Sequence, residues 1–190
     1  GAVAAVHQAA RMDLSGLAFH PASEQTTPTE REARQLWETT AEHGMISLIH
    51  TGFTRLGAGL AGGGGVTLEP ARPIHVDRLA ALYPEMKIIL AHTGPLWLDE
   101  ALAVAIHKSN VHLCLSGVAP SAMDAELLEL IAGPLSSRVH CGSDYPVGDP
   151  DAWLAGWAGL GLPEEVNQAV LVDNVSRLLA GCSDLLRRHR

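Results

Sequence analysis

The 190-residue sequence has few cysteines, and they are not grouped. Cys114, Cys141 and Cys182 are odd in number and widely separated, which excludes a disulfide framework and a Cys-x-x-Cys metal knot. Disulfides belong mainly to oxidising compartments, so their expected absence favours a reducing one. We therefore predict a cytoplasmic protein with free thiols.

Long apolar runs and clusters of positive charge are also missing. No apolar run approaches the ~20 residues that a membrane-spanning helix needs, and no secretory signal pattern is present. The formal net charge is -8, and the only basic cluster, Arg187–Arg190, is short and expected to be a solvated terminus. The sequence therefore predicts neither a membrane nor a nucleic-acid partner and favours a small-molecule substrate.

Two short apolar segments end in the same three residues, His-Thr-Gly. They are Ile46–Gly52 and Ile88–Gly94, both rich in branched residues. Such runs are typical of buried parallel strands. The histidines fall at the carboxyl ends of these strands, where parallel α/β folds keep their chemistry. We therefore predict a repeated strand–helix unit that presents His50 and His92 to a common site.

The other segments alternate between strand-like and helix-like patterns. Further strands are predicted at residues 14–21, 111–117 and 138–146, and helices at 2–12, 27–43, 70–83, 95–108, 124–132, 150–160 and 163–179. Five strand–helix units in this order predict an α/β fold with a parallel sheet. They fit either a complete open sheet of five strands or part of an eight-stranded barrel.

The segment from Phe53 to Thr67 is predicted to be a loop with four central glycines, Gly62–Gly65. No Gly-Lys-Ser/Thr follows these glycines, and no Gly-x-Gly-x-x-Gly follows the first strand, which excludes a P-loop and a dinucleotide fingerprint. Ordering four glycines costs backbone entropy. The loop is therefore expected to be a mobile active-site lid or a plain linker.

Four predicted strands end in side chains that bind metals or move protons: His20, His50, His92 and Asp144. Imidazole and carboxylate are the usual ligands of zinc and related divalent ions. Such an ion lowers the pKa of a bound water, and a neighbouring base then moves the proton. A packed histidine at each strand end is the simpler alternative, and Asp144 alternatively caps the next helix.

The motifs around these residues resemble those of the amidohydrolase-related (Amidohydrolase 2) family of metal-dependent amidohydrolases. The matching segments are Gly16-Leu-Ala-Phe-His20-Pro, His50-Thr-Gly, Ala91-His92-Thr-Gly, Gly142-Ser-Asp144-Tyr-Pro and Asp173-Asn-Val-Ser-Arg-Leu-Leu179. The resemblance implies that residues 1–190 form a single partial domain, the C-terminal part (about strands four to eight) of a TIM-type (β/α)8 barrel.

The resemblance also implies a role for each strand-end residue. His50 is expected to be a metal ligand, His92 a proton donor or acceptor, and Asp144 a ligand that also takes a proton from the bound water. The family's first-strand His-x-His has no counterpart here and is expected upstream of Gly1, where an uncapped helix already suggests a fragment. The chain is therefore expected not to hold its metal tightly alone.

The resemblance implies a metal-dependent hydrolase as the expected function. The sequence does not name its substrate. Zinc is the expected ion, and the attacked group is a carbonyl of an amide, ester or lactone. The same resemblance allows non-oxidative decarboxylation of an aromatic or semialdehyde acid. A third alternative is an inactive fragment or scaffold, whose exposed sheet edges would favour a homo-oligomer.

Four residues are candidates for substrate contact. His20 either lines the site or packs against the following proline. Arg55 either pairs with a substrate carboxylate or is a solvated loop arginine. Trp97 and Tyr145 either line the site or serve helix and loop packing.

Overall fold

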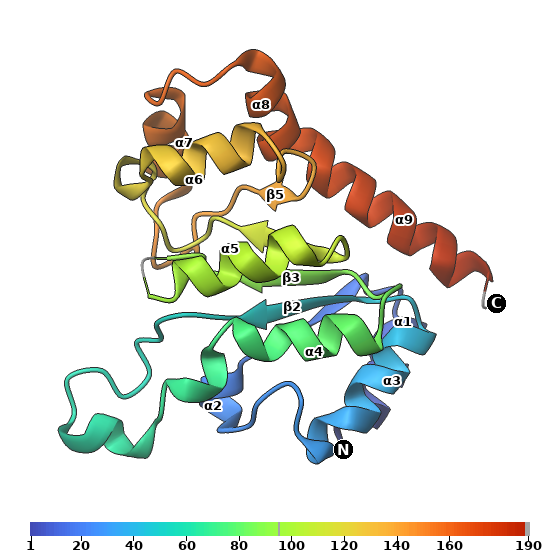
Figure 1. Cartoon of the computed structure of the whole chain (residues 1–190). Helices are drawn as coiled ribbons and strands as arrows, with labels where there is room; N and C mark the ends of the chain where they lie inside the picture. Colours follow the sequence, from blue (N-terminus) through green and yellow to red (C-terminus); the bar gives the residue numbers. More distant parts are fainter. Residues whose placement is uncertain (95, 189–190) are drawn as a thin grey trace.

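The computed structural model describes residues 1–94 and 96–188, with side chains to residue 182 (Figure 1). Pro95, where the predicted helix over 95–108 begins, and the side chains of the predicted solvated tail lie outside this part. None of the described helices is long and apolar enough to cross a bilayer. The cytoplasmic location stays a prediction.

Five parallel strands form one sheet in which each strand pairs with its neighbour in sequence. They are β1 (Gly16–Phe19), β2 (Ile46–His50), β3 (Ile88–Ala91), β4 (Val111–Cys114) and β5 (Val139–His140). An open doubly wound sheet reverses its strand order at a switch point, whereas a barrel keeps one direction throughout. The order β1-β2-β3-β4-β5 is therefore that of a barrel segment, which decides between the two predicted architectures.

Helices lie close to the predicted places, except that the helix predicted from residue 27 begins, as α3, only at Arg34, after a 3-10 turn at Arg31–Ala33. They are α1 (Ala2–Arg11), α2 (Pro21–Glu24), α3 (Arg34–Glu42), α4 (Ile74–Leu82), α5 (Leu98–His107), α6 (Ala125–Ala132), α7 (Pro150–Ala158), α8 (Glu164–Gln168) and α9 (Asn174–Arg188). The short α2 was not predicted. The helix predicted over 163–179 is α8, a π-helical turn at Ala169–Asp173, and α9, which runs beyond the predicted end.

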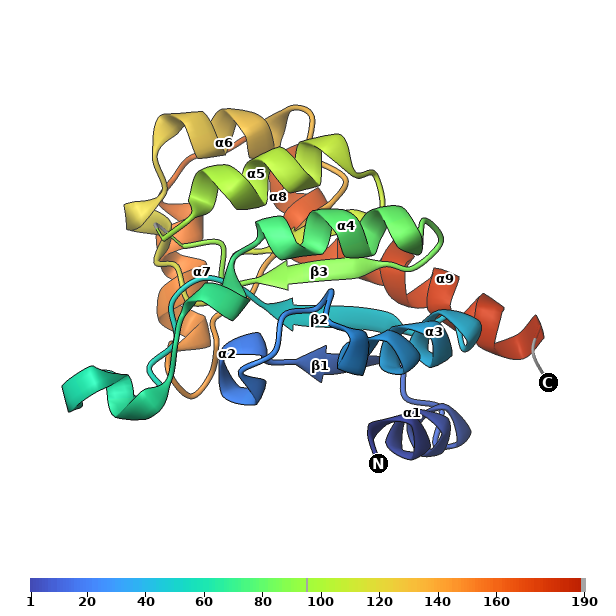
Figure 2. The same cartoon turned by 60° about the horizontal axis from the view of Figure 1, so that its bottom comes forward.

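One face of the sheet packs against α3 to α6 (Figures 1 and 2). Ile49, Leu90 and Leu113 lie in register on this face and are fully buried. Burying each such side chain contributes about 1.5–3 kcal/mol. The opposite face is less covered: Ile46 packs with Leu178 and Cys182 of α9, near the amino ends of the strands.

The two ends of the sheet differ in what surrounds them. In Figures 1 and 2 the strands point left, and α1 and the last turns of α9 lie toward the right, on the side of the strands' amino ends. The loop between β2 and α4 projects to the left from the carboxyl ends. In the described sheet β1 and β5 are the edge strands. Assembly through these edges stays a prediction.

Candidate active site

Three histidines meet at the carboxyl ends of adjacent strands. His20 follows β1, His50 ends β2, and His92 follows β3. The His20 and His50 rings are stacked, with centroids 3.9 Å apart, and the His50 and His92 centroids are 4.5 Å apart. The parallel register of the strands places these ends side by side. The structure thus brings together the histidines that the sequence predicts at a common site.

Asp144 joins this group from the segment after β5. Its Oδ1 lies 3.8 Å from Nε2 of His92. The N-cap of α7 is Asp149, so Asp144 does not have the alternative role of helix cap. His92 and Asp144 both adopt left-handed backbone conformations, with φ of 63° and 62°. Such conformations cost about 1–3 kcal/mol in non-glycine residues and cluster at functional sites.

The ring of His92 is held by the segment after β4. Its Nδ1 lies 3.2 Å from both the carbonyl oxygen and the hydroxyl of Ser116. A carbonyl only accepts, so Nδ1 carries the proton and donates it. In the neutral ring, Nε2 is then the unprotonated nitrogen that faces Asp144. Gly117 lies against this ring, and a Cβ there would come within 2.8 Å of Nδ1.

The other two imidazoles are kept neutral. Burial, together with the neighbouring His20 and His92, lowers the pKa of His50 to about 4. Burial also lowers the pKa of His20, and its Nδ1 accepts a hydrogen bond of 3.1 Å from the Ser23 amide as the cap of α2. Nε2 of His50 donates to the Phe53 carbonyl over 3.2 Å. Neutral imidazole is the form that binds metals.

The four residues line a cavity of about 590 Å³. The lining residues are His20, His50, Phe53, Thr54, Arg55, His92, Gly94, Leu96, Gly117, Val118, Asp144 and Val147. Sequence reasoning missed Gly117, Val118 and Val147, because glycine and valine side chains are not of a ligand or acid–base type and nothing in the local pattern marks them as cavity-lining. His20 and Arg55 are among the lining residues, and their contact with a substrate stays a prediction.

Trp97 and Tyr145 are not among these lining residues. The Trp97 ring lies 6.0 Å from the guanidinium carbon of Arg72, within the range of a cation–π contact. Tyr145 is 78% exposed. Contact of either residue with a substrate stays a prediction.

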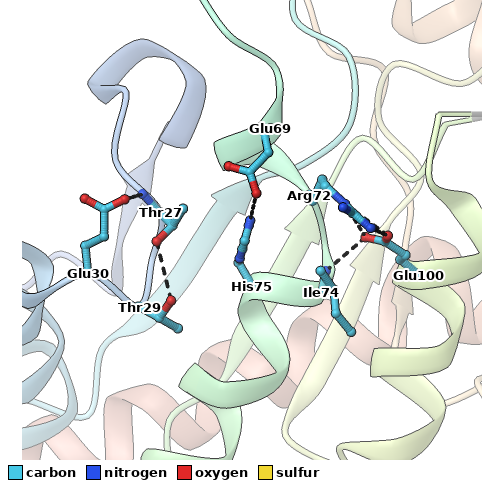
Figure 3. A network of polar contacts seen from close by, with 8 residues as sticks. All are labelled: Thr27, Thr29, Glu30, Glu69, Arg72, Ile74, His75 and Glu100. Carbon is cyan, nitrogen blue, oxygen red and sulfur yellow. Dashed lines mark hydrogen bonds and ion pairs between the residues drawn. The ribbon is translucent and has the colours of Figure 1, made fainter.

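Polar contacts anchor the long loop after β2 (Figure 3). Gly52 and Ala71 close its base through a backbone hydrogen bond of 3.0 Å. Just beyond, Arg72 forms an ion pair with Glu100 in the first turn of α5. This hydrogen-bonded pairing lowers the pKa of Glu100.

A second contact holds the same end of the loop, where Oε1 of Glu69 lies 2.8 Å from Nε2 of His75. Figure 3 also draws Glu30, which accepts from the Thr27 amide over 2.8 Å in the segment between α2 and α3. Between these anchored ends, the loop carries Gly62–Gly65 away from the sheet (Figures 1 and 2). Whether it acts as a lid or a linker is untested.

The donor chemistry of the site fits a divalent ion, because imidazoles and a carboxylate converge at one strand end. His50 and Asp144 are the residues that would hold it. Within the described part of the chain, no group of three His, Cys, Asp or Glu side chains is placed to hold an ion together.

Comparison with known proteins places this arrangement in a family. Residues 1–180 match the Amidohydrolase family model. No curated protein matches. Similar solved structures include an uncharacterised TIM-barrel protein from Bordetella bronchiseptica, with 18% identity and a TM-score of 0.78. The superposition covers 95% of this chain and 62% of the Bordetella protein.

Two further similar structures are decarboxylases. One is 2,6-dihydroxybenzoate decarboxylase from Rhizobium (14% identity, TM-score 0.69, 94% of this chain and 66% of that one). The other is 5-carboxyvanillate decarboxylase from Novosphingobium aromaticivorans, complexed with manganese and a nitrobenzoic acid (17% identity, TM-score 0.70, 94% of this chain and 60% of that one). The chain thus spans less than two thirds of the length of each of these three proteins.

At such low sequence identities, the structural similarity to these proteins shows the fold alone. The five-stranded sheet is part of a TIM-type barrel, and the strand-end residues lie at the barrel end where these folds place their chemistry. Together with the match over residues 1–180, this shows that the chain belongs to the Amidohydrolase family.

Proposed function

We propose that this chain carries the strand-end residues of a metal-dependent hydrolase that acts on a carbonyl group of a small molecule. The observation that carries the proposal is the pair formed by His92 and Asp144, whose Nε2 and Oδ1 are 3.8 Å apart at the wall of the cavity. A paired imidazole and carboxylate beside a cavity suit general acid–base catalysis.

The residues divide the work of the proposed reaction, and Asp144 has two roles. His50 and Asp144 would hold a divalent ion, which when bound would supply Lewis acidity toward a carbonyl and acidify water. His92 is fixed by Ser116 through Nδ1, so its Nε2 moves a proton between Asp144 and the substrate. Asp144 accepts a proton from the attacking water. Phe53 and Val118 add apolar side chains to the cavity lining.

Decarboxylation of a small acid is a second candidate. Arg55 lines the cavity with a positive charge suited to a carboxylate. The Rhizobium and Novosphingobium proteins of similar fold are decarboxylases of aromatic acids, one of them with manganese bound. In this reaction Nε2 of His92 first takes up a proton from solvent and then delivers it to the carbon that loses CO2. Zinc remains the proposed ion for hydrolysis, and manganese is the alternative for decarboxylation.

Turnover by the 190-residue chain with added Zn²⁺ or Mn²⁺ tests the proposal. Lactones, esters and N-acyl compounds report hydrolysis, and CO2 release from aromatic acids reports decarboxylation. We expect metal-dependent turnover that His92→Asn abolishes and that His107→Asn, an exposed change in α5, preserves. Equal turnover by His92→Asn would contradict the proposal. Metal binding without any turnover would favour the scaffold alternative.

A further inference from the structure

A cavity of about 570 Å³ lies between α3 and α4, on the helix-covered side of the sheet (Figures 1 and 2). Its lining comes from the segment before α3, the first half of α3, and the second half of α4 with the residue that follows it. None of its lining residues lines the cavity at the strand ends. Pockets for small organic molecules have volumes of about 300–1,000 Å³, so this cavity is large enough for a second, separate ligand.

The deeper lining of this cavity is apolar. Pro28, Trp37 and Leu79 line it and are buried. The indole of Trp37 donates to the Pro28 carbonyl over 2.7 Å, and its ring contacts Phe19 of β1 edge-on, with centroids 5.2 Å apart. These contacts fix the position of the apolar lining. Leu82, at the end of α4, lines the same cavity but is exposed, so it offers uncovered apolar surface to a ligand.

Three arginines line this cavity, and two of them lack a partner. Arg34 forms an ion pair with Glu38 over 2.8 Å. Arg31 and Arg78 are exposed, and among the side chains that the structure describes neither guanidinium has a hydrogen-bond or ion-pair partner. Two planar groups that are always charged therefore border one cavity with their donors unused.

The other polar side chains of the lining do not occupy these donors. Glu30 accepts from the Thr27 amide through Oε1 over 2.8 Å (Figure 3). The hydroxyl of Tyr83 has no hydrogen-bond partner within the described part of the chain. Burial raises the pKa of Tyr83, so its hydroxyl keeps its proton and can donate. The lining thus offers two guanidinium groups and one hydroxyl to an anion.

We propose that this cavity binds a small organic phosphate monoester. Such a group carries a charge of about -1.5 to -2 at neutral pH and three acceptor oxygens, which matches two guanidinium groups and one hydroxyl. A carboxylate carries one charge and two oxygens, so it would leave one of these donor groups unmatched. The phosphate lies at Arg31, Arg78 and Tyr83, and the organic group lies against Leu79 and Leu82. The proposal does not rest on the proposed function, because the cavity shares no residue with the strand-end site.

Titration of the 190-residue chain with phenyl phosphate tests the proposal. Calorimetry in a metal-free buffer gives the affinity, and amide NMR shifts locate the ligand. Phenyl sulfate has the same shape with a single negative charge, and inorganic phosphate lacks the organic group. The variants are Arg31→Gln and Arg78→Gln, with Arg11→Gln as the matched control. Arg11 is an exposed arginine at the end of α1 that does not line this cavity.

The expected pattern separates this site from general attraction of anions. Arg31→Gln and Arg78→Gln each weaken phenyl phosphate binding about tenfold, the loss of one charge-assisted contact, with unchanged thermal unfolding midpoints. Arg11→Gln binds as the parent chain does. Phenyl sulfate and inorganic phosphate bind at least about tenfold more weakly than phenyl phosphate. The amide shifts gather at residues 28–38 and 78–83.

Three results would overturn the proposal. The first is no binding of phenyl phosphate to the parent chain, and the second is unchanged affinity in both arginine variants. The third is a set of amide shifts confined to the strand-end cavity. Inorganic phosphate that binds as tightly as phenyl phosphate would remove the organic group from the proposed ligand. Since none of these measurements depends on turnover, a failure of the proposed reaction leaves them unaffected.

Discussion

Nε2 of His92 lies 3.8 Å from Oδ1 of Asp144, although the two residues follow strands that are not neighbours. Both have positive φ. The left-handed conformations turn the chain at the ends of β3 and β5 and place both side chains on the cavity wall. Two strained residues that meet at one point indicate that the fold is organised around this pair.

The carboxylate of Asp144 is expected to be required for turnover. Asp144→Asn keeps the size of the side chain but removes both its charge and its ability to accept a proton. We expect turnover to fall by about 10²–10⁴, the range for loss of a general acid or base, with an unchanged thermal unfolding midpoint. Asp151→Asn, at an exposed position of α7, is the control that should retain activity.

Gly117 is expected to be needed for the position of the His92 ring. Gly117→Ala places a Cβ within 2.8 Å of Nδ1 of His92 at a backbone φ of +75°, so the ring must move. Gly161 has φ of +63°, and a Cβ there would meet nothing within 4 Å. Gly161→Ala is therefore a control that imposes similar backbone strain without a steric clash. We expect turnover to fall at least about tenfold further in Gly117→Ala. Equal turnover in the two variants would show that this contact has no functional role.

Stability is expected to fall in acid because of a buried histidine pair. Nδ1 of His112 lies 3.0 Å from Nε2 of His140, and burial is the main cause that lowers their pKa values to about 3 and about 4. The unfolded chain therefore binds protons first, at its ordinary pKa of about 6.5. Stability from these groups is present above that pH and is lost as the pH falls toward 4 and 3.

A double variant tests this assignment. His112→Leu/His140→Leu removes both imidazoles, and replacing both partners by apolar groups is close to neutral at neutral pH. Urea unfolding at about pH 7 and about pH 5 should show a smaller acid loss in the double variant than in the parent chain. An equal loss would assign the acid sensitivity to other groups, such as His50, whose pKa is also lowered.

The core between the sheet and its helices is expected to tolerate truncation poorly. Leu113 of β4 is fully buried in this core, whereas Leu82 at the end of α4 is 60% exposed. Leu113→Ala should lower the free energy of unfolding by about 2–5 kcal/mol, and Leu82→Ala should change it by less than about 0.5 kcal/mol. Denaturant titration measures both, and similar values would contradict the assigned core.

The sequence predicted the parallel architecture and the histidine cluster because both depend on local patterns. Apolar runs that end in His-Thr-Gly fix the ends of β2 and β3, and adjacent strands place His50 and His92 together. The α2 helix was missed because it is four residues long, too short for a periodic pattern. The role of Ser116 and Gly117 was missed because it depends on where the β4 loop passes the His92 ring, a contact between distant segments.

The most direct test of the account is whether His50 and Asp144 hold a divalent ion beside His92. Zn²⁺ titration of the 190-residue chain, followed through imidazole ¹⁵N resonances, reports each histidine separately. We predict weak, saturable binding that shifts a ring nitrogen of His50, leaves His112 and His140 unchanged, and is lost in Asp144→Asn. A shift confined to other histidines, with His50 unmoved, would contradict the account.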